Sequence, residues 1–324
     1  MANPVDIVDI ITVPALIKDS FIKAGNVMLD DDVIPSPIHY VGGFAIVFPF
    51  VVNQEKWAFR CWYNDVGKIG NRLKVLSKEL EKVNLPYFCN LKYEDEGIVI
   101  DGEICPTTRM RWVDGLNIKE YICKNSQNKE KLFNLANKFK SLCLDLYRHN
   151  ISHGDLQHGN ILIDGNDNIY LIDYDSIYLP ALKGEPDFIS GLPSYQHPNR
   201  KNNKNANEKV DFFSELVIYI SILAFALDSS LIKEFNFENS DNMIFSQNDY
   251  IDITHTKAYK KLSVLSPEIR SLLAILEGYL IEKDINRLIP FWIIGSNSKY
   301  CINCGKEFFD IMDNYCIFCG AKRI

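Results

Sequence analysis

The stretch that decides the fold runs His153-Gly154-Asp155-Leu156-Gln157-His158-Gly159-Asn160. It places the carboxylate of Asp155 five residues before the carboxamide of Asn160, and a second acidic cluster follows as Asp173-Tyr174-Asp175. A carboxylate can accept a hydroxyl proton, and Mg²⁺ prefers hard oxygen ligands while keeping some of its waters. The stretch therefore holds the groups that a phosphoryl-transfer site needs.

Two short apolar runs join these clusters. Residues 161–163 and 169–172 predict two strands, and the polar residues 164–168 between them predict a turn. A hairpin of this length brings its two ends side by side. We therefore expect Asp155, Asn160 and Asp173 to converge.

The composition is that of a soluble globular protein, and 324 residues suffice for a large core or two lobes. The formal charge of -7 argues against nucleic acid as the main partner, because phosphate binding needs a basic surface. The longest apolar run, residues 216–227, is too short to span a bilayer, so we expect no membrane span. Scattered cysteines with one terminal cluster predict a reducing, cytoplasmic location.

The N-terminal part of the chain predicts mostly strands. Residues 1–30 are mixed apolar and acidic and predict only a short strand or helix. Gly42 and Gly43 lie between β-forming residues, where backbone N–H groups can approach phosphate oxygens, although an ordinary hairpin turn has the same pattern. In the strand over residues 57–62, alternation places Arg60 on one face with its second neighbours along the chain.

A helix is predicted over residues 69–83, where apolar residues recur at helical spacing. Glu79 borders its apolar face and is either the partner of an inward ion pair or a solvated boundary charge. Asp101-Gly102 predicts a tight hairpin turn. The strand that follows, through Met110, is interpreted as the link between two lobes.

The C-terminal part predicts mostly helices. An apolar stripe predicts one helix over residues 132–146, and the all-apolar run 216–227 predicts a buried central helix with Asp211 near its start. Residues 229–260 are polar and predict a loop. Ser266-Pro267 begins a further helix, with serine as the cap.

The tail contains two Cys-x-x-Cys pairs, each followed by glycine. Their thiolates can present a tetrahedral sulfur site, for which zinc is the first candidate and iron the second: Cys301, Cys304, Cys316 and Cys319. The alternative is free or disulfide-paired cysteines. Because so short a segment has little core, a bound metal would fold it.

From about residue 30 to 295 the sequence resembles a eukaryotic-like protein kinase. The order of its motifs carries the resemblance: the glycine loop, the strand with Arg60, the helix with Glu79, the hinge after Met110, the loop His153–Asn160, Asp173-Tyr174-Asp175, and Asp211 before the central helix. With its terminal cysteines, the whole chain is similar to bacterial kinase-like proteins found beside tellurium-resistance and phosphatase genes.

The resemblance implies an α+β, bilobal protein-kinase-like fold with a small C-terminal zinc ribbon. An N-terminal extension over residues 1–30 would precede a β-rich N-lobe over residues 31–112. A helical C-lobe would follow over residues 113–297, and the zinc ribbon would occupy residues 298–324.

The resemblance also implies ATP and Mg²⁺ (or Mn²⁺) as cofactors, beside Zn²⁺ in the ribbon. Asp155 would orient or deprotonate the acceptor hydroxyl, while Asn160 and Asp173 would hold the metal. The implied nucleotide-binding residues are Gly42, Gly43, Phe44, Val47, Arg60, Glu79, Met110, Trp112 and Val113. The implied partners are a nucleotide and a protein substrate or signalling protein, such as a phosphatase.

Several residues depart from the protein-kinase pattern and leave the function open. Arg60 replaces the strand lysine, Gly154 replaces an arginine, and Gln157 and Asp175 replace a lysine and a glycine. An arginine at a tight lysine site is not a conservative exchange. The sequence is therefore interpreted as a Ser/Thr-directed phosphotransferase, a small-molecule kinase, or a pseudokinase that binds nucleotide and presents the zinc ribbon to a partner.

Overall fold

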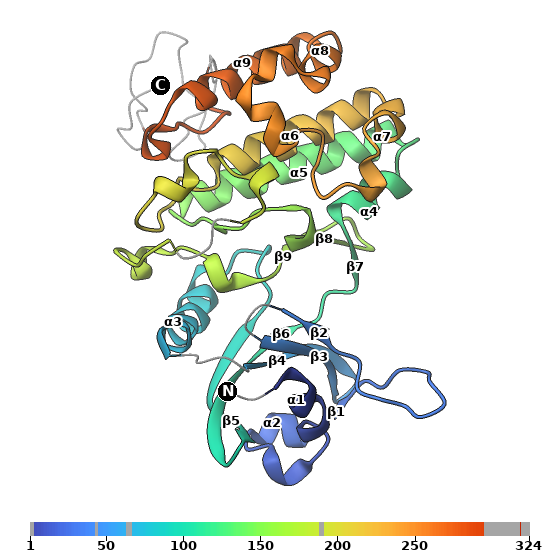
Figure 1. The fold of residues 1–324 in the computed structure, drawn as a ribbon, viewed down its shortest axis with the longest axis vertical. Helices are drawn as coiled ribbons and strands as arrows, with labels where there is room; N and C mark the ends of the chain where they lie inside the picture. The colour runs from blue at the N-terminus through green and yellow to red at the C-terminus, as the bar shows by residue number, and fades with distance from the viewer. Residues whose placement is uncertain (1–2, 43–44, 63–66, 188–190, 295–317, 319–324) are drawn as a thin grey trace. The chain divides into compact units, whose positions relative to one another are not determined.

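Figure 1 shows the computed structural model, which describes residues 3–42, 45–62, 67–187, 191–294 and 318. Contacts divide the chain into two compact units. Unit 1 comprises Met1–Gly115 together with Tyr170–Asp175, and unit 2 comprises Leu116–Ile169 together with Ser176–Ile324. Unit 1 is therefore discontinuous in sequence.

Unit 1 is built on an antiparallel sheet whose strands are ordered β1-β3-β4-β6-β5, with β2 also paired to β3, among the described residues. The strands are β1 Asn26–Val27, β2 Tyr40–Val41, β3 Ala45–Val52, β4 Glu55–Trp62, β5 Leu91–Ile100 and β6 Glu103–Arg111. The predicted turn at Asp101-Gly102 is confirmed, because both residues have positive φ, 52° and 84°, as a type I′ hairpin turn requires.

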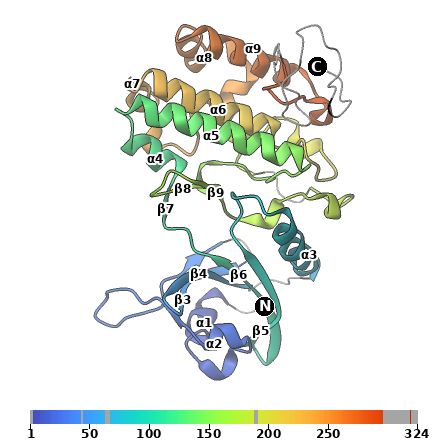
Figure 2. The ribbon, with the colours of Figure 1, turned by 180° about the vertical axis from the view of Figure 1, so that it is seen from behind.

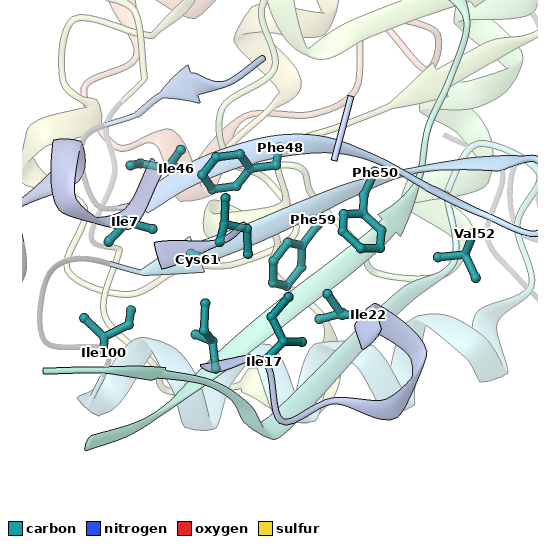
Figure 3. Packing of buried hydrophobic residues seen from close by; sticks show 12 residues of the cluster. Ile7, Ile17, Ile22, Ile46, Phe48, Phe50, Val52, Phe59, Cys61 and Ile100 are labelled. Atoms are coloured by element: carbon teal, nitrogen blue, oxygen red, sulfur yellow. The ribbon is translucent and has the colours of Figure 1, made fainter. Parts of the chain in front are cut away.

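The N-terminal segment covers one face of this sheet. It forms α1 Pro4–Ile10, a 3-10 turn at Pro14–Leu16 and α2 Ser20–Lys23. Their isoleucines Ile7, Ile17 and Ile22 pack on strand residues such as Phe48 and Phe59 (Figure 3). Burying each isoleucine stabilises the fold by roughly 1.5–3 kcal/mol. The described part of the segment, residues 3–30, thus contributes buried isoleucines to the core of unit 1.

Helix α3 (Gly67–Val83) confirms the helix predicted over residues 69–83. Its buried leucines, Leu73, Leu76 and Leu80, follow the helical spacing that predicted it. The helix packs along β5. Arg72 lies among these leucines with only 4% of its surface exposed.

Backbone hydrogen bonds and the side chain of Tyr174 are among the contacts that attach the late segment Tyr170–Asp175 to unit 1. The Leu171 N–H donates to the Tyr87 carbonyl at 2.8 Å. The Tyr174 hydroxyl donates to the Leu171 carbonyl at 2.8 Å and accepts the Cys89 N–H at 2.7 Å. Burial raises the pKa of Tyr174 well above its ordinary value, so this phenol stays protonated.

Unit 2 consists mainly of helices. They are α4 Ile118–Lys124, α5 Lys129–Arg148, α6 Phe212–Leu227, α7 Ser230–Glu234, α8 Lys257–Leu262 and α9 Pro267–Ile281. Helices α5 and α6 lie side by side in both views (Figures 1 and 2), and α9 packs against α6. Every residue of α6 from Phe212 to Ala226 is buried, which confirms the predicted central helix.

The predicted strands around residues 164–168 are present as β8 Ile161–Asp164 and β9 Ile169–Leu171. They belong to a small sheet in the order β7-β8-β9, with β7 at Gly115–Asn117. In the turn, the Asp164 carboxylate accepts the N–H groups of Asn166 and Asn168, each at 2.8 Å. An aspartate that bonds to nearby backbone N–H groups in this way stabilises a turn.

The prediction of a loop over residues 229–260 is wrong. The segment forms α7, α8 and several 3-10 turns between them. Buried side chains, including Phe237, Phe245 and Tyr250, hold these short pieces to the helices. The polar residues that suggested a loop instead cap short helices: Thr256 accepts the Tyr259 N–H at 3.1 Å.

His197 makes the stability of unit 2 depend on pH. Its Nδ1 accepts the Asn199 N–H at 3.1 Å, so its Nε2 must donate to the Tyr279 carbonyl at 2.8 Å. Burial lowers the pKa of His197 below 6.5. A histidine whose folded pKa is lowered stabilises the fold above about pH 6.5, and this stability is lost as pH falls below that value.

We therefore expect the free energy of unfolding to fall by up to about 1 kcal/mol through His197 between about pH 7.5 and about pH 5.5. Urea unfolding of the full chain at both pH values measures this loss. The variant His197→Asn should lack that share of the pH dependence, while His255→Asn, at an exposed histidine, should keep it. An equal dependence in both variants would contradict the prediction.

No helix in the described part of the chain is long and apolar enough to cross a membrane.

Candidate functional site

The sheet of unit 1 places several predicted nucleotide-binding residues on one face. Strand register pairs Val47 with Arg60, and Ala58 with Met110. Partners across a sheet point to the same side, so these side chains share the face opposite the N-terminal helices. The ring of Trp112 lies 6.3 Å from that of Tyr40, whose strand partner is Val47. Tyr40 is a member of this face that sequence reasoning missed.

Arg60 is the cation of this face and is bound to a carboxylate. Its Nη1 and Nη2 donate to the two oxygens of Asp175 at 2.6 and 2.7 Å. Its guanidinium also lies 4.4 Å from the centre of the Trp62 ring, and its Nη1 is 3.8 Å from Asp173 Oδ1. The predicted grouping of Arg60 with Trp62 on one face is thus confirmed.

Arg72, on α3, is a second cation that contacts Asp175. Its Nε donates to the backbone carbonyl of Asp175 at 3.1 Å. Sequence reasoning missed Arg72, although it stands four residues before Leu76 and so lies on the apolar face of the helix.

Glu79 pairs with a lysine of its own helix. Its Oε1 accepts from Lys82 Nζ at 2.7 Å, an i,i+3 pair on the outer part of α3. Asp175 and Asp173 are both carboxylate partners of Arg60. Of the two expectations for Glu79, the contact with Lys82 on the same helix fits the boundary charge.

Asp173 has a left-handed backbone, with φ of 63°. Such a conformation is uncommon outside glycine, although aspartate tolerates it, and it often marks functional sites. The side chain of Asp173 is 49% exposed, against 12% for Asp175. Of the two carboxylates, Asp173 is therefore the one accessible to a ligand from solvent.

In unit 2, Asp211 holds the loop that begins at His153. Its carboxylate accepts the backbone N–H groups of both His153 and Gly154. Asp211 is buried, and burial raises the pKa of its carboxyl, while the two N–H groups and Arg200 act against that rise. Asp211, at the start of the central helix, thus holds the backbone of the two residues just before Asp155.

Asp155 and Asn160 lie together at the end of this loop. The Asn160 amide nitrogen donates to the Asp155 carbonyl at 2.8 Å and to its Oδ2 at 3.2 Å. Asp155 Oδ1 is buried and has no hydrogen-bond partner in the described structure. Gly191 has a φ of 65°, and a Cβ there would lie 2.5 Å from Asp155 Oδ1. A glycine at 191 therefore lets the backbone approach the carboxylate.

Gly154 is required by the backbone of the loop. Its φ is 81°, and an added Cβ would overlap the carbonyl oxygen of Ser176. No side chain fits at this position without a shift of the backbone. Gln157 also acts locally, because its Oε1 accepts the Gly159 N–H at 2.8 Å and caps a 3-10 turn.

His158 is a neutral structural histidine. Its Nδ1 lies 2.7 Å from the Tyr195 hydroxyl. Burial, and then the charge of Lys119, lower the pKa of His158. The imidazole therefore stays uncharged near neutral pH and links the loop to Tyr195.

Several predicted site residues lie outside the described residues: Gly43, Phe44, Cys301, Cys304, Cys316 and Cys319. Gly42 is described, and its N–H donates to the Ala45 carbonyl at 2.9 Å. Among the described residues, no group of three or more His, Cys, Asp or Glu side chains is arranged to hold a metal ion.

The donor atoms of Asn160 and Asp173 suit magnesium. Asn160 uses its amide nitrogen on Asp155, so its amide oxygen is the atom that it can offer a metal. Asp173 offers an accessible carboxylate. Mg²⁺ is held by one or two carboxylates with substrate phosphates and several waters rather than by a full protein cage. Asn160 belongs to unit 2 and Asp173 to unit 1.

The antiparallel sheet of unit 1 and the helices of unit 2 are compatible with a kinase-like fold. One comparison identifies the class more closely: residues 107–179 match the sequence model of the ABC1 atypical kinase-like domain. The matched segment runs from β6 through α4 and α5 to the loop His153–Asn160, and includes Asp173 and Asp175. This part of the chain is kinase-like.

Proposed function

We propose that this protein is an ATP- and Mg²⁺-dependent phosphotransferase of the protein-kinase-like class, directed at a Ser or Thr hydroxyl. The match of residues 107–179 to a kinase-like domain, with Asp155, Asn160 and Asp173 all inside it, carries the proposal. Catalysis in this class is mainly positioning and charge neutralisation.

Each residue has a distinct role in the proposal. Asp155 orients the acceptor hydroxyl and accepts its proton, since its Oδ1 is not engaged by another described protein group. Asn160 donates to Asp155 and so fixes the carboxylate. Asn160 and Asp173 are the metal ligands, and the bound Mg²⁺ supplies neutralisation of the phosphate charge.

The nucleotide would lie on the sheet face that carries Val47, Ala58 and Met110. Small and apolar side chains suit a purine ring, and an aromatic residue such as Trp112 adds contact area. Arg60 is the phosphate-binding cation. An arginine can bind two phosphate oxygens at once, whereas a lysine acts as a point charge.

A second candidate function is a pseudokinase that binds nucleotide without transfer and presents the C-terminal segment to a partner. One observation favours it: Arg60 is held by Asp175 through both terminal nitrogens. The cation that would assist transfer is thus engaged within the protein. The cysteine pairs at residues 301–319 stay a proposed zinc ribbon, which metal analysis of the purified full chain would test.

The test is binding and turnover measured on the same protein. Calorimetry with ATP and Mg²⁺ should detect binding, and labelled ATP should transfer its terminal phosphate to a Ser/Thr peptide library or to a panel of small hydroxyl compounds. Transfer only to the small compounds would favour a small-molecule kinase.

The variant Asp173→Asn should lose transfer and weaken binding of the metal–nucleotide complex, because it removes a charged metal ligand. The variant Asp95→Asn, which removes an exposed carboxylate of the same unit that pairs with Lys74, should behave as the wild type. Binding without transfer to any acceptor would favour the pseudokinase. No binding would exclude both functions.

A further inference from the structure

The phosphate-binding face of Arg60 is already occupied by a carboxylate of the same unit. Both terminal nitrogens of the guanidinium donate to Asp175, one to each oxygen, at 2.6 and 2.7 Å. Arginine frequently binds a phosphate group through the same kind of two-point contact. A phosphate and Asp175 therefore compete for the same two N–H groups.

Other contacts hold the pair in place from several sides. Arg60 stacks on Trp62, which fixes the plane of the guanidinium. Arg72 binds the backbone carbonyl of Asp175 at 3.1 Å, and the neighbouring Tyr174 is hydrogen-bonded within unit 1. The side chains of Arg60 and Asp175 are only 19% and 12% exposed. An ion pair so shielded from water is stronger than one on the surface.

We infer that Asp175 controls access to the phosphate-binding cation: it holds Arg60 until a phosphate group displaces it. This inference rests on the proposed function, because it takes Arg60 as the residue that receives the nucleotide phosphates. No covalent step is involved. The change is an exchange of one oxygen anion for another on the same guanidinium, with release of the Asp175 carboxylate.

The exchange has a consequence for the metal. Once displaced, the Asp175 carboxylate has lost its cation and lies near an incoming triphosphate, so the two negative charges repel. A divalent cation that arrives with the triphosphate offsets this repulsion. The wild type should therefore bind a triphosphate poorly without metal, and a chain without the Asp175 charge should depend much less on the metal.

The experiment compares the wild type with Asp175→Asn by calorimetry, using inorganic tripolyphosphate and ATP, each with and without Mg²⁺. We expect Asp175→Asn to bind tripolyphosphate without metal about tenfold more tightly than the wild type, a difference typical of one charge-assisted hydrogen bond. The matched control is Asp95→Asn, which removes a carboxylate from an exposed ion pair of the same unit and should leave both affinities unchanged.

The opposite role for Asp175 gives the opposite result. If the carboxylate orients Arg60 for phosphate, Asp175→Asn will bind tripolyphosphate more weakly, and the inference is overturned while the proposed function stands. If the wild type and Asp175→Asn bind tripolyphosphate with equal affinity, the inference is overturned while the proposed function stands. If neither folded protein binds tripolyphosphate or ATP under any condition, the proposed function and the inference both fail.

Circular dichroism of each variant establishes that it is folded. Where Asp175→Asn does not fold, the wild type itself supplies the test through the carboxyl ¹³C resonance of Asp175. Tripolyphosphate that saturates the site should shift this resonance in step with binding. Binding with no shift of the Asp175 carboxyl would overturn the inference.

Discussion

Replacing Asp211 by asparagine is expected to destabilise unit 2 by about 3 kcal/mol. The carboxylate is buried and accepts the N–H groups of both His153 and Gly154. Asparagine has nearly the same volume but only one acceptor oxygen, so the Gly154 N–H, which lies 3.0 and 3.1 Å from the two carboxylate oxygens, loses one of its two acceptors and faces an amide NH₂. Urea unfolding of the full chain, followed by tryptophan fluorescence and circular dichroism, measures the loss.

The control for this prediction is Asp249→Asn. Asp249 also accepts a backbone N–H, from Ser246 at 2.7 Å, but it caps a short 3-10 helix and is only partly buried. Its replacement should destabilise the chain by about 1 kcal/mol, the usual effect of losing a helix cap. Equal losses at the two positions would mean that the loop before Asp155 does not depend on Asp211 as the geometry indicates.

The variant Asp155→Asn is expected to reduce phosphoryl transfer by about 10²–10⁴-fold, the usual contribution of a general base. Asparagine keeps the shape of the side chain and can still contact Asn160, but it cannot accept a proton. The affinity for ATP and Mg²⁺ should stay within about twofold of the wild type, since Asp155 is not a proposed metal ligand.

Single-turnover kinetics and calorimetry measure the two quantities separately. Glu130→Gln, at an exposed carboxylate on α5, is the matched control and should change neither. A loss of ATP affinity in Asp155→Asn that matches the loss of transfer would assign Asp155 to metal binding instead. Unchanged transfer would remove it from the mechanism.

Most of the architecture follows from patterns that depend on near neighbours in the sequence. The turn Asp101-Gly102 needs two residues of positive φ, and Asp-Gly is one of the pairs that adopt this conformation readily. The helix α6 and the cap of α9 at Ser266 were likewise predicted, because an all-apolar run and a capping serine have local causes.

The pairing of Arg60 could not be predicted in the same way. Its partner Asp175 is 115 positions away in the sequence, and nothing local distinguishes it from Glu79 as a counter-charge. Arg72 had a local signal, its place among the leucines of α3, but a buried arginine is intelligible only when its acceptor is known. Long-range ion pairs are settled by the tertiary fold.

The division of unit 1 into two pieces has a consequence for protein synthesis. Residues 116–169, 54 positions by the boundaries of the units, are made after the first piece and before the second. Until Tyr174 and Asp175 leave the ribosome, the Cys89 N–H and the Arg60 guanidinium lack the partners they have in the finished fold. A nascent chain stalled near residue 115 should therefore be more sensitive to protease in this region than one released beyond residue 175. The strands of the N-terminal sheet are made early, but the pairing of Arg60 with Asp175 is completed only when a much later part of the chain has been made.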